Sequence, residues 1–425
     1  MSKRTLRRRT FLKGAAAGAA AGAFAGGFAA GFPWAPAIAE QAPIKVGLLT
    51  VLTGPLAQGG LQMKQGLSLF FEEKNYKIAG RKVDLIIGDT GGNPAGTKAK
   101  AQELIERDKI DVMCGPLAAF EMLAISDYVI EHKMPTLALA GAENVTQRKP
   151  NPYFLRVSAT SSQAMHPMAD YARKEMGLKK VITICEDFAF GYEQIGGFQQ
   201  VFEDEGGRVL KKLWTPIVTP DYTPFLAQIE GAGLDGVVQG FAGSNPIRFM
   251  QQYANYGLKK KYPVVGGETA GDDALLKSFG DDAIGLVSAC PYSYAYPSES
   301  NKRFVAGMVK MTGYLPGFYA AALYMDGMVI EDALKKTGGK TDNPDEFMKA
   351  LRAVSVKESP RGPFHFDHFG NVVGNIFIRK VEKKDGKLAN PILKTYHNVS
   401  QFWTYPEAKF LAQPVYSRDW PPLKS

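Results

Sequence analysis

Short apolar segments alternate with longer amphipathic segments through the first third of the chain. Residues 44–49, 83–88 and 111–114 are mostly apolar and too short to form helices, which is typical of buried strands. Residues 61–73 and 97–107, which separate them, carry apolar side chains at helical spacing. This alternation predicts βαβ units and a parallel sheet that has helices on both faces.

The alternation continues with a predicted helix at 119–131 and a strand at 136–139, and it starts again after Arg156. The predicted strands that follow lie at 180–184, 209–210, 236–238, 263–265 and 285–287, and the predicted helices at 162–176, 192–205, 224–230 and 246–255. The sequence therefore predicts an α/β protein with two doubly wound lobes in series.

The last third of the chain has a different pattern. Two helices, 299–311 and 318–336, follow each other without a strand between them. Residues 364–366 and 375–378 flank a turn, as the two strands of an antiparallel hairpin do. We expect this part to return to the two earlier lobes. The tail, 405–425, is rich in proline and aromatic residues, and we expect it to run over the surface.

In open α/β sheets, ligands bind beyond the carboxyl ends of the strands. The loops that follow the predicted strands lie at 50–60, 89–94, 115–120, 139–146, 186–192, 240–246 and 266–272. The sequence therefore predicts a ligand site that is built from these loops.

Residues 1–39 have the composition of an export signal. Six basic residues and no acid precede Gly14, a long Ala/Gly stretch follows, and Ala37-Ile38-Ala39 is a small-x-small cleavage site. The run Arg8-Arg9-Thr10-Phe11-Leu12-Lys13 is typical of twin-arginine signals. A membrane anchor is the alternative, but Ala and Gly gain little from hydrocarbon. We expect cleavage after Ala39 and export to the periplasm.

The net charge of +9 owes much to this leader, which holds six of the 51 Lys and Arg residues and none of the 42 Asp and Glu residues. The remainder is nearly balanced. Its one dense basic run, Lys259-Lys260-Lys261, is short and lies in a predicted turn, so we expect a solvated face and no nucleic-acid partner.

The motifs of common enzymes are absent from the sequence. Cys114, Cys185 and Cys290 lie in or after apolar runs and are expected to be inert core thiols. The glycine-rich loop 54–60 lacks the Lys and Ser/Thr of a phosphate-binding loop. The group His365, Asp367 and His368 belongs to a hairpin, where neighbours face opposite ways. We expect no catalysis, no cofactor and no metal.

Several short motifs occur in a characteristic order along residues 43–400. They are Ile44-Lys45-Val46-Gly47, Thr53-Gly54-Pro55-Leu56-Ala57, Asp89 with Asn93-Pro94, Gly115-Pro116, Gly191-Tyr192, and Gly362-Pro363-Phe364-His365-Phe366-Asp367 with Gly370. In this order they resemble the leucine/branched-chain amino acid-binding proteins. These are type I periplasmic solute-binding proteins of ABC transporters, which deliver a small ligand to a permease in the inner membrane.

The resemblance implies two lobes joined by three hinge crossovers. The first lobe would comprise 43–158 plus 290–360, and the second 159–289 plus 361–404. A ligand-sensing subunit of a regulatory system, which shares the fold, is the alternative function. An export signal argues against a cytoplasmic regulator.

In the family, Ser and Thr hydroxyls and backbone N–H groups after the third and fourth strands hold an amino acid's carboxylate. The corresponding segments here are Leu117-Ala118-Ala119 and Leu139-Ala140-Gly141, which lack those hydroxyls. The helix that follows Gly54 offers further N–H groups. We therefore expect N–H groups near Gly54, Ala118 and Gly141 to hold a ligand carboxylate.

Aromatic side chains are expected on the other side of the cleft. Phe188, Phe190, Tyr192 and Phe241 lie in predicted loops of the second lobe. Phe190 and Phe241 take the place of tyrosines that line the family's cleft. Glu268 matches the family's ammonium-binding acid. Glu268 favours an apolar or aromatic amino acid as ligand, whereas the lost hydroxyls favour an aromatic or other apolar carboxylate.

Overall fold

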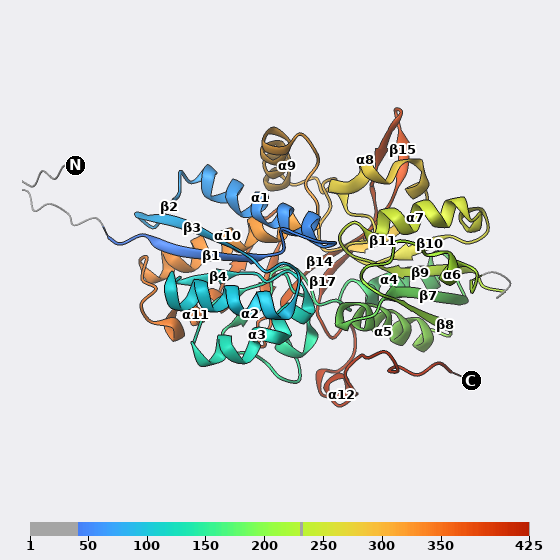
Figure 1. Cartoon of the computed structure of the whole chain (residues 1–425), viewed down its shortest axis with the longest axis horizontal. Coiled ribbons are helices and arrows are strands. Elements are labelled where there is room, and N and C mark those ends of the chain that lie inside the picture. Colours follow the sequence, from blue (N-terminus) through green and yellow to red (C-terminus); the bar gives the residue numbers. More distant parts are fainter. Residues whose placement is uncertain (1–40, 230–232, 425) are drawn as a thin grey trace, which may run out of the picture. The chain divides into compact units, whose positions relative to one another are not determined.

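Two β-sheets organise the chain (Figure 1). The computed structural model describes residues 41–229 and 233–424, so the predicted export signal and its cleavage site lie outside the described residues. We call the first sheet and the helices packed on it the first lobe, and the second sheet with its helices the second lobe. The expected α/β architecture, with mainly parallel strands, is confirmed.

The first sheet has the strand order β2-β3-β1-β4-β5-β6 and is parallel except for the edge strand β2. Its strands are β1 (Ile44–Thr50), β2 (Lys77–Ile78), β3 (Arg81–Asp89), β4 (Val112–Cys114), β5 (Thr136–Leu137) and β6 (Phe154–Leu155), and its first helices are α1 (Ala57–Glu73), α2 (Pro94–Gln102) and α3 (Ala119–Glu131). One π-helical turn, Glu103–Arg107, extends α2. The register pairs Thr50 with Asp89, so β1 and β3 end at the same level.

The second sheet has nine strands. Strands β7 (Lys180–Glu186), β8 (Arg208–Thr215), β9 (Gly236–Gly240), β10 (Val264–Gly266) and β11 (Val287–Cys290) are parallel, whereas β12 (Ser355–Val356), β13 (Phe364–Phe366), β14 (Val372–Lys380) and β17 (Ile392–Val399) form antiparallel pairs. Its helices are α4 (Met165–Lys174), α5 (Ala189–Asp204), α6 (Thr223–Leu226), α7 (Asn245–Asn255) and α8 (Leu276–Phe279). The expected hairpin is β13–β14. Strand β17 and the small hairpin β15 (Glu382–Lys384) and β16 (Lys387–Ala389) were not predicted.

The chain returns to the first lobe after β11. Helices α9 (Glu299–Thr312), α10 (Phe318–Thr337) and α11 (Pro344–Arg352) follow in sequence, and α10 packs along α1. The helices approach so closely that a Cβ at Gly66 would stand 2.0 Å from the carbonyl oxygen of Ala320. The chain thus passes between the lobes three times, after β6, after β11 and before β12. The boundaries predicted from the sequence stay a prediction; strand β12 falls inside 290–360 but pairs in the second sheet.

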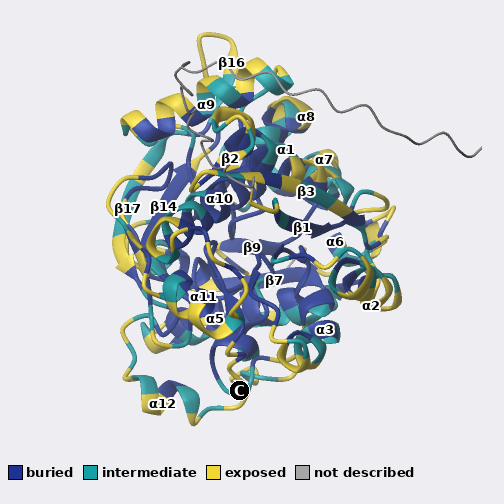
Figure 2. Ribbon diagram, turned by 90° about the vertical axis from the view of Figure 1, so that its left-hand side faces the viewer, coloured by how far each residue is buried: buried dark blue, intermediate teal, exposed yellow. Residues whose placement is uncertain are grey.

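Burial is concentrated in the sheets and the helices between them. Figure 2 shows β1, β7 and β9 as buried and places exposed residues on α2 and α12 (Glu407–Leu411). Cys114, Cys185 and Cys290 are buried and unpaired, as predicted, and burial raises their pKa values. No helix in the described part of the chain combines the length and apolar character that crossing a membrane requires.

The tail lies on the second lobe. Phe402, Phe410 and Tyr416 form a small buried cluster, and Gln199 of α5 donates a hydrogen bond to the Pro422 carbonyl (2.9 Å). Gly196 of α5 leaves room for the Tyr416 ring, since a Cβ there would be 2.4 Å from it. The tail is therefore packed against α5 and β8 rather than extended into solvent.

Candidate functional site

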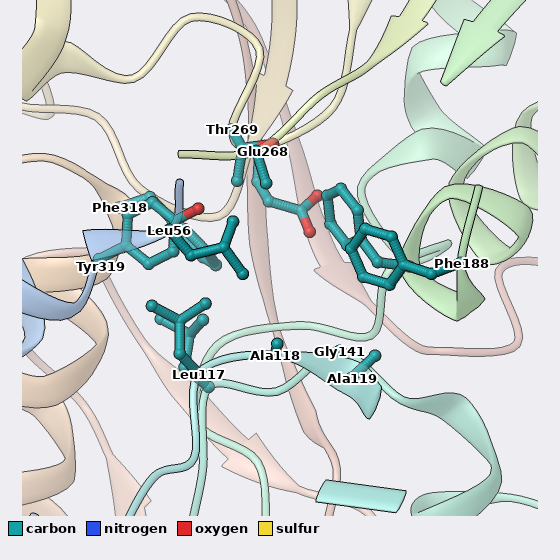
Figure 3. Close-up of a pocket in the computed structure, with 13 residues that line it drawn as sticks. Leu56, Leu117, Ala118, Ala119, Gly141, Phe188, Glu268, Thr269, Phe318 and Tyr319 are labelled. Atoms are coloured by element: carbon teal, nitrogen blue, oxygen red, sulfur yellow. The ribbon is translucent and has the colours of Figure 1, made fainter. Parts of the chain in front are cut away.

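The loops at the carboxyl ends of both sheets enclose a pocket (Figure 3). Its empty volume is about 400 Å³, which suits a small ligand. The lining residues are Leu56, Leu117, Ala118, Ala119, Leu139, Gly141, Phe188, Phe190, Ala242, Glu268, Thr269, Phe318 and Tyr319. Six of the seven predicted loops contribute, and loop 89–94 does not.

Seven of the nine residues predicted as ligand contacts line this pocket: Leu117, Ala118, Ala119, Leu139, Gly141, Phe190 and Glu268. Gly54 is not among the lining residues; it forms the turn before α1 at a positive φ of 84°. Phe241 is fully buried in the core of the second lobe, with its ring 4.9 Å from that of Phe249. As ligand contacts, all nine stay predictions.

Aromatic rings form two walls of the pocket. Phe188 and Phe190 stack with ring centroids 5.8 Å apart, and Phe318 lies 5.4 Å from Tyr319. Figure 3 shows Phe188 on one side of the space and Phe318 and Tyr319 on the other. Such walls favour a flat apolar ligand.

Two details of these walls were not predicted. Phe190 and Tyr192 belong to helix α5 rather than to a loop, and Tyr192 is not a lining residue but donates a hydrogen bond to Asp187 (2.6 Å). Phe318 and Tyr319 come from α10, which was expected as a helix of the returning segment, with no sequence signal that its first turn reaches the cleft.

Helix N-termini surround the pocket. Leu56, Ala118 and Phe188 are the N-cap residues of α1, α3 and α5, and none of the three has a side-chain acceptor for the first N–H groups of its helix. The N–H group of Ala118 is already paired, because it donates to Glu121 (2.9 Å). The remaining first-turn N–H groups carry partial positive charge, so they favour an anion although no Lys or Arg lines the pocket.

Glu268 is the one carboxylic acid among the lining residues. Its side chain is 3% exposed, and Oε2 has no hydrogen-bond partner within the described chain. Burial raises its pKa to about 8, so the group is mainly protonated at neutral pH. Its neighbour Thr269 is already satisfied, because its hydroxyl donates to the Phe241 carbonyl (2.6 Å).

A buried junction beside the pocket joins the two lobes. Asp272, in the loop after β10, accepts hydrogen bonds from Gln62 Nε2 of α1 (2.7 Å) and from the Phe318 N–H at the start of α10 (2.9 Å). The next residue, Asp273, forms a fully buried ion pair with Arg379 of β14 (2.9 Å). Asp272 of the second lobe therefore caps α10, a helix of the first lobe.

No group of three or more His, Cys, Asp or Glu side chains in residues 41–229 and 233–424 is arranged to bind a metal ion. His365 and His368 are exposed at the predicted hairpin, and His368 lies 3.3 Å from Glu407.

The sequence matches the periplasmic binding protein family over residues 43–387. The chain belongs to this family. A Leu/Ile/Val-binding protein homolog from Brucella suis is 30% identical over 364 residues, which cover 83% of this chain and 91% of the homolog. Family membership implies a periplasmic location, and the resemblance drawn from the sequence motifs is confirmed.

Solved structures agree with the family. A solute-binding protein of an ABC transporter from Rhodopseudomonas palustris BisB5, in complex with 3,4-dihydroxybenzoic acid, is 37% identical with a TM-score of 0.80, and the match covers 84% of this chain and 98% of that one. Another from R. palustris, in complex with 4-hydroxybenzoate, is 30% identical with a TM-score of 0.80 and coverage of 85% and 98%. These relatives are substrate-binding proteins rather than enzymes. This periplasmic binding protein has the same general role.

Proposed function

We propose that this protein captures a small aromatic carboxylate in the pocket of Figure 3 and delivers it to an ABC permease. The observation that carries the proposal is an apolar, aromatic-walled pocket surrounded by helix N-termini whose N-cap side chains accept no hydrogen bond. The N–H groups favour a carboxylate, and the rings favour a flat apolar body. The two R. palustris relatives support this class, since both hold hydroxylated benzoic acids.

A ligand screen tests the proposal. The purified protein is melted with benzoate, 4-hydroxybenzoate, 3,4-dihydroxybenzoate, leucine, isoleucine, valine and phenylalanine. A ligand that binds only the folded state raises the melting temperature by mass action. We expect the benzoates to raise it and the amino acids to leave it unchanged. A rise with amino acids alone would show that the proposed ligand class is wrong.

We also propose that residues 1–39 direct export by the twin-arginine pathway, with cleavage after Ala39. The paired arginines are the feature that the transporter reads. Replacing Arg8 and Arg9 by Lys should leave the precursor in the cytoplasm, whereas Arg4→Lys, which keeps the pair, should not. Equal periplasmic amounts of both variants on a fractionation blot would contradict this route.

A further inference from the structure

One end of the pocket has an unsatisfied polar group. Glu268 Oε2 is buried without a hydrogen-bond partner in the described chain, although the pocket around it is mainly apolar. A buried polar atom without a partner lowers stability, so such atoms are normally paired with another group or with water. Figure 3 shows the Glu268 carboxyl group directed into the space between Phe318 and Phe188. A ligand in this space lies next to the carboxyl group of Glu268.

A second unsatisfied side chain stands behind Glu268. Gln194 of α5 is fully buried, and neither its Nε2 nor its Oε1 forms a well-aligned hydrogen bond with another group in the described residues. Gln194 packs on the backbone just before Glu268, where a Cβ at Gly267 would stand 2.5 Å from Nε2. Gln194 is close enough to Glu268 to lower the pKa of that carboxyl slightly. The amide is therefore placed to orient Glu268.

The two ends of the pocket have different chemistry. Figure 3 shows Ala118, Ala119 and Gly141 at the end opposite Glu268. That end includes the N-terminus of α3, where Glu121 accepts a hydrogen bond from the Ala118 N–H and the N–H groups that follow favour the ligand carboxylate. A ring that lies between the aromatic walls with its carboxylate at α3 directs its far edge toward Glu268. The group on that edge is para to the carboxylate.

We propose that Glu268, oriented by Gln194, recognises a hydroxyl group at the para position of the ligand ring, so that para-hydroxylated aromatic acids are the preferred ligands. This inference rests on the proposed function. A hydroxyl both donates and accepts a hydrogen bond, and so does a protonated carboxyl group. The raised pKa of Glu268 agrees with this pairing, because the protonated carboxyl group can donate a hydrogen bond to the hydroxyl oxygen.

Calorimetric titration of the wild type with four acids tests the inference without a mutation. The ligands are benzoate, 4-methylbenzoate, 3-hydroxybenzoate and 4-hydroxybenzoate; the methyl group matches the hydroxyl in size but forms no hydrogen bond. We expect 4-hydroxybenzoate to bind at least about fivefold more tightly than each of the other three, because its hydroxyl pairs a buried group. If 4-methylbenzoate or 3-hydroxybenzoate binds as tightly as 4-hydroxybenzoate, the inference is wrong.

Variants assign the preference to residues. In Glu268→Leu, the ratio of the benzoate Kd to the 4-hydroxybenzoate Kd should fall to about 1. In Gln194→Leu, this ratio should fall at least about twofold. Glu186→Gln is the matched control, because Glu186 is also a buried acid of the second lobe with a raised pKa but does not line the pocket.

The outcomes separate the two proposals. If benzoate binds as tightly as 4-hydroxybenzoate, the aromatic-acid function stands and the hydroxyl site is wrong. If none of the four acids binds and an amino acid does, the proposed function is wrong and the hydroxyl site falls with it. The assignment to Glu268 is also wrong if Glu268→Leu leaves the ratio of the benzoate Kd to the 4-hydroxybenzoate Kd unchanged, or if Glu186→Gln lowers this ratio to about 1.

Discussion

The ionisation of Glu268 sets the charge of the pocket. Burial raises its pKa to about 8, so below this pH an anionic ligand meets a neutral carboxyl group, and above it a second negative charge. We expect the affinity for benzoate to be constant from about pH 6 to 7.5 and to fall by up to about tenfold per unit well above pH 8. Calorimetry across this range measures the effect.

The control for this titration is Glu268→Gln, in which benzoate affinity should not change over the same range. An amino acid would behave in the opposite way, since ionised Glu268 attracts its ammonium group. An affinity that increases between pH 7 and 9 would therefore contradict an aromatic acid as the natural ligand.

Phe190 and Phe241 were both predicted to contact the ligand, and their surroundings now separate them. Phe190 lines the pocket, whereas Phe241 packs on Tyr222 and Phe249 in the core. Phe190→Ala should weaken ligand binding by about 1–3 kcal/mol through lost apolar contact. Phe241→Ala should lower the free energy of unfolding by about 3–5 kcal/mol, as large-to-small core substitutions do. Calorimetry and chemical denaturation of both variants compare the two effects.

At the scale of elements, the bond between Gln62 of α1 and Asp272 joins the two lobes, and neither of these two residues lines the pocket. Ligand affinity depends on how stable the closed arrangement is. Gln62→Leu removes this bond and leaves the buried Asp272 with one donor fewer. We expect it to weaken ligand binding by about 1–2 kcal/mol, mainly through faster dissociation, in stopped-flow measurements.

Gln65 provides the matched control, since it lies one turn further along α1 and accepts a hydrogen bond from Tyr314 within the first lobe (2.6 Å). Gln65→Leu should leave the ligand dissociation rate unchanged. Equal effects of the two substitutions would indicate that α1 is disturbed generally and that Gln62 does not act as a bond between lobes.

The sequence predicted the elements of the parallel sheets well, because apolar strands and amphipathic helices have distinct periods. The helix predicted at 119–131 matches α3. The sequence pattern did not predict β6 and β2, because each is only two residues long. It also did not predict β17, in which exposed and half-buried residues hide the apolar pattern. It also missed the start of α1, because Leu56 is an apolar N-cap without the usual Ser, Thr, Asp or Asn signal.

The candidate site was predictable where it depends on strand order and unpredictable where it depends on tertiary packing. The carboxyl ends of parallel strands gather the loops, so seven predicted residues meet in one pocket. The direction of a side chain is set by its neighbours in the fold, which place Phe190 at the pocket and the Phe241 ring beside Phe249 in the core. The contributions of Phe318, Tyr319 and Asp272 arise only when α10 returns to the first lobe.

At the scale of the whole molecule, two buried glutamates connect the lobes near the crossovers. The Glu143 N–H, in the first lobe, donates to Glu193 Oε1 of α5 (3.1 Å), and Oε2 of both residues lacks a partner in the described chain. Arg156 and Arg148 are the cations that act on Glu143. Burial outweighs them, raising the pKa of Glu143 to about 7 and that of Glu193 well above its usual value.

This pair predicts how stability depends on pH. Both carboxyls hold protons in the folded protein at pH values where the unfolded chain has released them. The folded state is therefore favoured at low pH, and stability falls as pH rises from about 4.5 through 7.

The variant Glu193→Gln, which lacks one of the two acids, tests this prediction. The free energy of unfolding of the variant minus that of the wild type should be about 1–3 kcal/mol larger at pH 8 than at pH 5. Glu382→Gln, an exposed acid of β15, should show no such increase. Denaturation curves at the two pH values measure the difference, and a difference that does not change with pH would mean that Glu193 is ionised in the folded protein.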